Sequence, residues 1–293
     1  MNMAVDNQYA KSIQRIYPEL FIHSVERFGS GQNNDTVLVN SELVFRFPKY
    51  EEGIEQLERE AVFLHRIVDR VPMEVPRPIY RSFYPNGIGD AFIGYKKIAG
   101  EPLETEMLHT IRDECELRRL AGQLGLFLKQ LHTMEPDDIG LYGTADGVYA
   151  EWSNMYERIQ TKLYPYMKQE ARHWTDFHFT GFLKDKGNFE IAQVPIHGDF
   201  GTSNILYDSH RRHISGIIDF GSAGIGDPAV DYAGLLASYG ERFFRFVADE
   251  YPEATDMMDR IVFYHGTFAL QEALFGIENN DPAAFRNGME RFR

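Results

Sequence analysis

Two polar segments lie close together in the second half of the chain, and each follows a short apolar run. The first is His197-Gly198-Asp199, with Asn204 five residues after the aspartate, and the second is Asp219-Phe220-Gly221. The apolar runs at 191–196 and 214–219 are typical of buried strands. The pattern therefore predicts that polar side chains gather at the ends of two strands.

These residue types suit the transfer of a phosphoryl group from a nucleotide. Such transfer needs a divalent cation against the phosphates and a group that accepts or orients the proton of the attacking hydroxyl. Mg²⁺ takes oxygen ligands from one or two carboxylates plus substrate phosphates. Asn204 and Asp219 supply such oxygens, and Asp199 would face the hydroxyl. The alternative interpretation makes all three turn or capping residues, a common use of Asp and Asn.

The spacing H-G-D-x-x-x-x-N, followed by D-F-G, resembles the catalytic and metal loops of kinases. The chain as a whole resembles the aminoglycoside phosphotransferases, a branch of the protein-kinase-like fold, and is most similar to the aminoglycoside 2″-O-phosphotransferases. The likeness covers most of the chain and rests on segments 44–49, 92–97, 197–199, 217–221 and 227–231. It implies that Asp199 is the catalytic aspartate and that Asn204 and Asp219 hold Mg²⁺.

The resemblance implies an α+β fold with two lobes. A small antiparallel β lobe would span residues 1–97, and a larger, mainly helical lobe would span 98–293. Local patterns agree with this division. Strands are predicted at 21–28, 36–39, 43–47 and 91–95, and apolar residues at helical spacing predict helices over 54–68 and 117–131. Residues 134–187 are expected to be helical with loops, and 230–293 return to helical patterning.

The expected nucleotide contacts come from the first hundred residues. The Gly/Asn-rich stretch 29–35 would cover the phosphates, with Ser30 as the contacting residue, although a plain hairpin turn looks much the same. Kinases place a Lys paired with a helix Glu to hold the phosphates; here the matching residues are Arg46 and Glu60, unless they form a mere surface pair.

Three further nucleotide contacts follow from the resemblance. Tyr95 would close the back of the base pocket, and the backbone from Lys96 to Ile98 would bond the purine edge. A bulky Tyr narrows the room for adenine and implies a shift from ATP toward GTP. The alternative is that Tyr95 is a core residue of a buried strand.

The acceptor site is expected in the C-terminal region. Aminoglycosides carry several ammonium groups, and residues 241–293 hold ten acidic residues against six basic ones. Glu272 lies where the family places substrate-binding carboxylates. Glu241 is a second candidate, and Tyr239 would border the same cleft. The alternative is a solvated acidic helix face.

Composition limits the other possibilities. The chain has 293 residues, enough for two domains at about 150 residues each, and its net charge of −14 argues against a nucleic-acid partner. The single cysteine, Cys115, excludes an internal disulfide and multi-cysteine metal sites. No apolar run is long enough for a membrane helix, and the first twenty residues lack a signal-peptide core. We expect a cytoplasmic monomer with no membrane partner.

The implied activity is Mg²⁺-dependent phosphorylation of an aminoglycoside by GTP or ATP, which would confer antibiotic resistance. The partners are thus a nucleotide and a small polycationic acceptor. Only five residues separate the metal loop from Asp227, too few for a protein kinase's activation segment. Two alternatives stay open. One is a kinase of another small molecule, such as a macrolide, choline, methylthioribose or homoserine. The other is a nucleotide-binding scaffold without catalysis.

Overall fold

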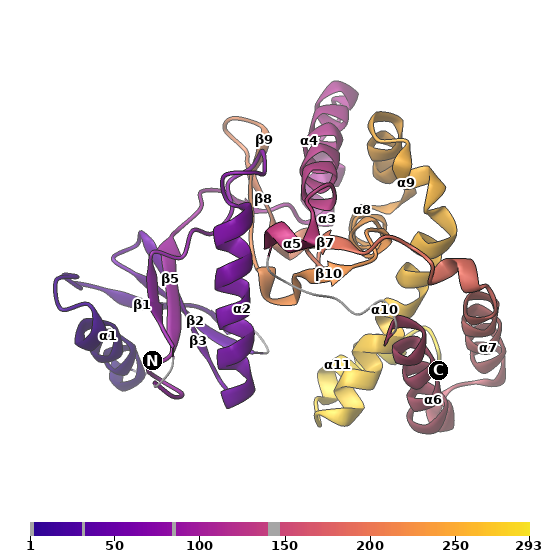
Figure 1. Cartoon of the computed structure of the whole chain (residues 1–293), viewed down its shortest axis with the longest axis horizontal. Coiled ribbons are helices and arrows are strands. Elements are labelled where there is room, and N and C mark those ends of the chain that lie inside the picture. The colour runs from indigo at the N-terminus through magenta and orange to yellow at the C-terminus, as the bar shows by residue number, and fades with distance from the viewer. Residues whose placement is uncertain (1–2, 31–32, 84–85, 140–146) are drawn as a thin grey trace.

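The computed structural model describes residues 3–30, 33–83, 86–139 and 147–293. It has an α+β kinase-like fold, in which an antiparallel sheet precedes a larger helical lobe (Figure 1). The sheet lobe holds α1 (Met3–Ile16), β1 (Val25–Ser30), β2 (Asn34–Val39), β3 (Leu43–Pro48), α2 (Glu51–Ile67), β4 (Tyr80–Ser82) and β5 (Phe92–Lys96). Its strand order is β1-β2-β3-β5-β4, with every neighbouring pair antiparallel.

Alternation along the strands explains how the two helices cover the sheet. One face, which includes Phe45, Phe47 and Phe92, packs against Ile13 of α1. The other face carries the buried side chains Val44, Ile93 and Tyr95, and it packs against Leu57 and Ala61 of α2. Because successive strand residues point to opposite faces, Arg46 shares the α2 face with Val44. The helix predicted over 54–68 is confirmed as α2, whereas no pattern had predicted α1.

The helical lobe follows from residue 101 onward. Its helices are α3 (Thr105–Thr110), α4 (Glu114–His132), α5 (Pro136–Ile139), α6 (Val148–Lys162), α7 (Gln169–Lys184), α8 (Ala229–Glu250), α9 (Glu253–Asp256), α10 (Met258–Glu278) and α11 (Pro282–Met289). The predicted stripe on α4 is confirmed, because Leu120, Leu124, Phe127, Leu128 and Leu131 are fully buried. None of the helices in the described ranges combines the length and apolar character that a membrane crossing needs.

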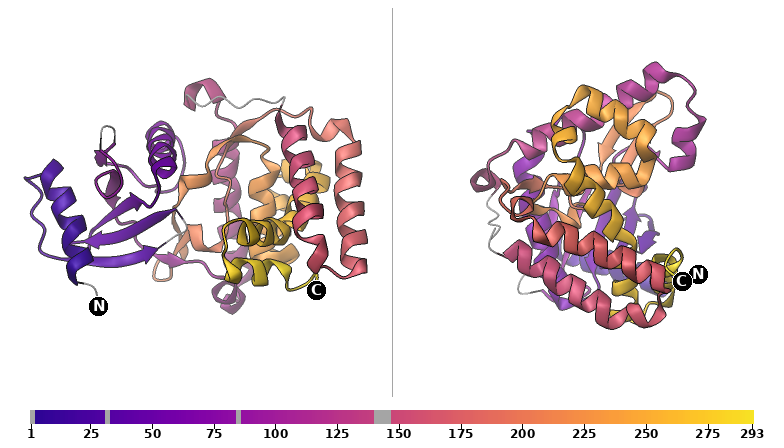
Figure 2. Two further views of the ribbon diagram at one scale, coloured as in Figure 1. Left: turned by 90° about the horizontal axis from the view of Figure 1, so that it is seen from below. Right: turned by 90° about the vertical axis from the view of Figure 1, so that its right-hand side faces the viewer.

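Short strands in this lobe carry the polar loops. They are β6 (Glu101–Pro102), β7 (Val194–Ile196), β8 (Ile205–Asp208), β9 (His213–Ile217) and β10 (Gly224–Gly226). β7 pairs with β10, and β8 lies between β6 and β9. The strand predicted over 191–196 forms only from Val194, and β8 and β10 had not been predicted. The side view in Figure 2 shows these strands where the two lobes adjoin. The lobe boundary between residues 97 and 98 stays a prediction.

Candidate active site

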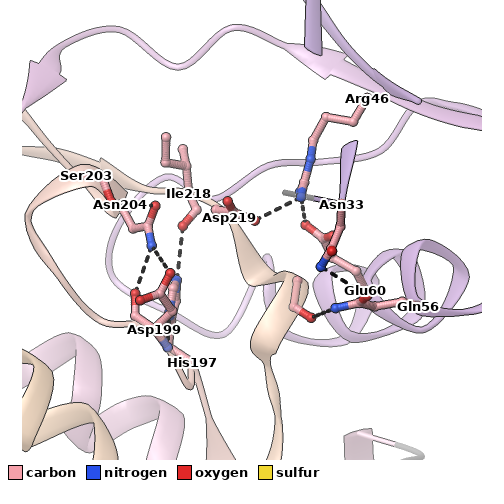
Figure 3. Close-up of polar contacts among 11 residues, drawn as sticks. Asn33, Arg46, Gln56, Glu60, His197, Asp199, Ser203, Asn204, Ile218 and Asp219 are labelled. Atoms are coloured by element: carbon pink, nitrogen blue, oxygen red, sulfur yellow. Dashed lines mark hydrogen bonds and ion pairs between the residues drawn. The ribbon is translucent and has the colours of Figure 1, made fainter. Parts of the chain in front are cut away.

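The loops that follow β7 and β9 lie against each other. The Ile218 N–H donates to the Asn204 carbonyl at 2.9 Å, so the backbone itself joins them. His197 Nε2 lies 3.0 Å from the Ile218 carbonyl, which adds a side-chain bond between the same loops. These contacts bring Asp199, Asn204 and Asp219 into one site, as the sequence pattern predicted (Figure 3).

Asn204 holds Asp199 in place. Its buried side-chain amide donates from Nδ2 to the Asp199 carbonyl at 2.8 Å and to Asp199 Oδ2 at 2.9 Å. Since both partners accept hydrogen bonds only, the NH₂ group faces Asp199, and Asn204 Oδ1 points elsewhere. Ser203 Oγ donates to that oxygen at 3.3 Å. The Asp199 carboxylate is thereby oriented while the residue stays exposed to solvent.

Asp219 adopts a left-handed backbone conformation, with φ of 61°. This region is uncommon for residues other than glycine, but Asp tolerates it better than most. The sharp turn re-aims the side chain toward the sheet lobe, where Asp219 Oδ1 accepts from the Arg46 guanidinium at 2.8 Å. In the described part of the chain, Asp219 Oδ2 has no hydrogen-bond donor, which leaves it available to a ligand.

Arg46 joins three elements that are distant in sequence. Its buried guanidinium pairs with Glu60 of α2 as well as with Asp219. Burial opposes the charge on Arg46, but the carboxylates of Glu60 and Asp219 prevail and raise its pKa above the usual value. Arg46 and Glu60 thus form a buried pair that faces the site, not a surface pair. Gln56 of α2 adds a bond from Nε2 to the Gly221 carbonyl at 2.6 Å.

Asp231, the first acidic residue of α8, holds the loop that carries Asp199 by hydrogen bonds to its backbone. Its fully buried carboxylate accepts from the N–H groups of His197 at 2.9 Å and Gly198 at 2.8 Å. His132 Nε2 of α4 lies 3.0 Å from the same group. Gly198 has φ of 79°, and a Cβ there would come within 2.3 Å of the Ser222 carbonyl oxygen. The loop therefore requires glycine at that position.

A cavity lies between the two lobes. Its volume, about 650 Å³, is that of a small-molecule pocket. Its lining includes Gly29, Arg46, Tyr95, Asp199 and Asp219. Tyr95 is buried where it lines the cavity, and burial raises the pKa of this phenol to about 12, so the hydroxyl stays neutral. The Ser30 backbone pairs with Asp35 at the end of β1. The structure does not describe the Ser30 side chain or residues 31–32.

The segment after β5, where the sequence predicted a purine-binding edge, is bonded through its backbone to the residue before β3. The Lys97 N–H donates to the Glu42 carbonyl at 2.7 Å. Since backbone groups alternate along an extended chain, the Lys96 carbonyl and the Ile98 N–H turn away from that strand. Ile98 lines the cavity, whereas the Lys96 side chain is exposed and outside the lining.

A second cavity, of about 510 Å³, opens on the other side of Asp199. Asp199 and Ser222 line both cavities. The rest of the loop after β7 adds Gly198, Phe200 and Gly201. Helices α6, α8 and α10 supply the other lining residues, which include Glu151, Trp152, Ser238, Tyr264, Phe268 and Gln271. This arrangement leaves one carboxylate, that of Asp199, between two spaces that can each hold a ligand.

The structure does not place the expected acceptor residues in this second cavity. Tyr239 is buried on another side of α8, and its hydroxyl donates to the Leu103 carbonyl at 2.9 Å. Glu241 follows a break in α8 at Gly240, where φ is 73°, and it is exposed outside the lining. Glu272 is also exposed, next to the lining residue Gln271. Helical geometry turns adjacent residues by about 100°, so neighbours in sequence face different sides.

Sequence reasoning missed Glu151 and Trp152. Both lie on α6, inside the aromatic-rich stretch 134–187 that showed no clear pattern. The aromatic ring of Trp152 packs edge-on against Phe263 of α10 at 5.1 Å, which brings α6 to the cavity. A carboxylate directly beside a tryptophan was the available signal, but no feature of the nearby sequence indicated that this pair would lie close to Asp199.

Comparisons with known proteins found a family match and similar solved structures. The sequence pattern described as the phosphotransferase enzyme family (APH) matches residues 24–264. Viomycin phosphotransferase of Streptomyces vinaceus is 25% identical over 261 residues, covering 88% of this chain and 89% of that protein. The GDP and kanamycin complex of APH(2″)-IIIa has a TM-score of 0.88 at 27% identity, covering 97% of this chain and 96% of that one.

A macrolide 2′-phosphotransferase of type I has the same fold, with a TM-score of 0.76 at 18% identity. The match covers 99% of this chain and 97% of that one.

Proposed function

This chain belongs to the phosphotransferase enzyme family (APH), and from that premise we propose that it transfers the γ-phosphoryl group of GTP or ATP to a hydroxyl of an aminoglycoside. One observation carries the proposal: the cavity between the lobes meets the second cavity, which we call the acceptor cavity, at Asp199. A carboxylate at that junction can accept the proton of a hydroxyl on one side while a phosphate lies on the other. Transfer of this kind depends mainly on positioning and on neutralising charge.

The donor set fits Mg²⁺. The Asp219 carboxylate lines the cavity, and Asn204, which bonds to the lining residue Asp199, offers a hard oxygen in Oδ1. Mg²⁺ binds through one or two carboxylates plus substrate phosphates. When bound, the ion would neutralise phosphate charge. Asn204 and Asp219 would hold it, Arg46 would contact phosphate oxygens, and Asp199 would orient the attacking hydroxyl and receive its proton.

The acceptor cavity favours a cation with apolar surface. Its carboxylates are Glu151 and Asp199, while Trp152, Tyr264 and Phe268 add aromatic faces that attract ammonium groups. The kanamycin complex of APH(2″)-IIIa supports an aminoglycoside as the acceptor. The aromatic lining also suits a macrolide, and this is the second candidate.

A direct test measures nucleoside diphosphate release by the purified protein with Mg²⁺. GTP and ATP are supplied in turn, and the acceptor panel includes kanamycin, gentamicin, a macrolide and choline. We expect release to be stimulated by the aminoglycosides. Stimulation by the macrolide or choline alone would contradict the proposed acceptor, and nucleotide binding with no stimulation would favour a scaffold.

Tyr95 is expected to set the nucleotide preference. The buried Tyr95 ring lines the cavity and would narrow the room for adenine, so GTP should have a higher kcat/KM than ATP. Replacing Tyr95→Met opens that space, and the ATP-to-GTP ratio of kcat/KM should rise about tenfold, as expected for a change of a few methylene-sized contacts. Steady-state kinetics with both nucleotides at saturating acceptor measure this ratio. A native preference for ATP would contradict the assignment.

Glu151 is expected to bind an ammonium group of the acceptor. Glu151→Gln should raise the acceptor KM about tenfold, the loss of one charge-assisted hydrogen bond, with little change in kcat. Glu157→Gln is the matched control, because Glu157 is exposed on the same helix outside the cavity. Equal KM values for Glu151→Gln and the native protein would remove Glu151 from the site.

A further inference from the structure

A third cavity, of about 380 Å³, lies in the helical lobe between α3, the start of α4 and the second half of α8. Among the described residues, it shares no lining residue with the two cavities above. Its volume falls within the range of small-molecule sites. Figure 1 shows α3, α4 and α8 side by side in the upper part of the helical lobe.

The floor of this cavity is apolar and rigid. It is formed by the nearly inaccessible side chains of Leu108, Leu117, Tyr239, Phe243 and Phe246. The Tyr239 and Phe243 rings pack edge to face at 5.2 Å, which limits their movement. Since the Tyr239 hydroxyl is bonded to the Leu103 carbonyl, it is not free to serve a ligand in the cavity. The floor therefore suits a flat apolar body.

The rim, in contrast, is cationic. Arg112 and Arg242 line it together with His109, and none of the carboxylates in the described part of the chain does so. This is unusual in a chain whose net charge is −14. Within the ranges that the structure describes, no hydrogen bond or ion pair occupies either guanidinium. Nearby Arg118 differs, because it stacks on Phe246 and pairs with Glu114 and Asp249.

We propose that this cavity binds a small amphipathic anion, namely an aromatic body that carries one sulfonate or carboxylate group. The body would lie on the aromatic floor, and the acidic group would meet Arg112 and Arg242. A guanidinium offers a planar fork of N–H donors that matches two acidic oxygens, so two free arginines at one rim select for charge as well as shape.

The site is separate from the chemistry proposed above and does not rest on it. None of its lining residues lines the cavity between the lobes. A ligand here should therefore bind together with a nucleotide, without displacing it.

The test uses a matched pair of probes on the full chain. 1-Anilinonaphthalene-8-sulfonate carries the anion, and N-phenyl-1-naphthylamine is the same body without it. We expect the sulfonate to bind with one-to-one stoichiometry, measured by fluorescence and calorimetry, in the presence of saturating GDP. The double variant R112Q/R242Q should weaken the sulfonate about tenfold or more and change binding of the neutral probe by less than about twofold.

R245Q is the control, because Arg245 is exposed one turn further along α8 and does not line the cavity. It should bind both probes as the native protein does. Unchanged thermal unfolding of R112Q/R242Q would show that the double variant folds, since both arginines lie at the surface. Three results would each overturn the proposal: no sulfonate binding by the native protein, equal sulfonate binding by R112Q/R242Q, or displacement of the sulfonate by GDP.

Discussion

Replacing Asp199→Asn should lower kcat by about 10²–10⁴-fold, the range that a positioned general base contributes. An amide accepts no proton at neutral pH, but it has nearly the shape of the carboxylate. Its oxygen can still accept the bond from Asn204 Nδ2 that orients the native side chain at 2.9 Å. The loss should therefore lie in the chemical step. The measurement is acceptor-stimulated release of nucleoside diphosphate under saturating substrates.

Two controls separate this loss from damage to the site. The nucleotide dissociation constant of Asp199→Asn should stay near the native value, because Arg46 and the segment after β5 are untouched. Asp259→Asn removes an exposed carboxylate of α10 elsewhere on the same lobe and should leave kcat unchanged. Native turnover by Asp199→Asn would exclude its role as the base.

Replacing Asp231→Ala should destabilise the protein by about 3–5 kcal/mol, because each buried donor left without its acceptor costs about 1–3 kcal/mol. The N–H groups of His197 and Gly198, together with His132 Nε2, would lose their acceptor inside the protein. For a chain of this size, the loss should lower the unfolding midpoint by roughly 10 °C. Thermal and urea unfolding measure the change, and activity should fall with it because the loop of Asp199 loses its support.

The Asp231 carboxylate should also make the free energy of unfolding depend on pH. Burial favours the neutral form of Asp231, but the hydrogen bonds from His132 and the His197 N–H prevail and lower its pKa below the usual value. A lowered pKa in the folded state stabilises the protein above the unfolded value of about 3.9, and this contribution is lost as the pH falls through the folded value.

The gap in unfolding free energy between the native protein and Asp231→Ala should therefore be constant near neutral pH and narrow below about pH 4. Asp256→Ala, an exposed carboxylate of α9, should show no such gap. A gap that persists unchanged into strong acid would contradict the assigned charge of Asp231.

Much of the sheet lobe followed from local patterns. Two runs of β-forming residues joined by a short polar turn predicted β2 and β3, and helical spacing predicted α2 and α4, because each pattern is local. α1 was missed, and so were β8 and β10. β8 begins directly after Asn204 and was interpreted as part of a loop, and the three residues of β10 are too few to show alternation.

The family followed from the sequence by itself, and so did the prediction that Asp199, Asn204 and Asp219 lie together. That prediction needed only residue types and spacings within two short loops, which do not depend on how the rest of the chain packs. The pairing of Arg46 with Glu60 was also expected from the resemblance, and the structure brings the two together.

Only the tertiary structure decided what surrounds those loops. Asp219 reaches Arg46 across 173 positions of sequence, and Glu151 joins Asp199 only because α6 packs against α10. The acidic count of residues 241–293 pointed instead to Glu241 and Glu272, which are exposed and do not line the cavity. Which side of a helix meets a cavity depends on the path of the chain and the angle of packing, and no local period encodes either one.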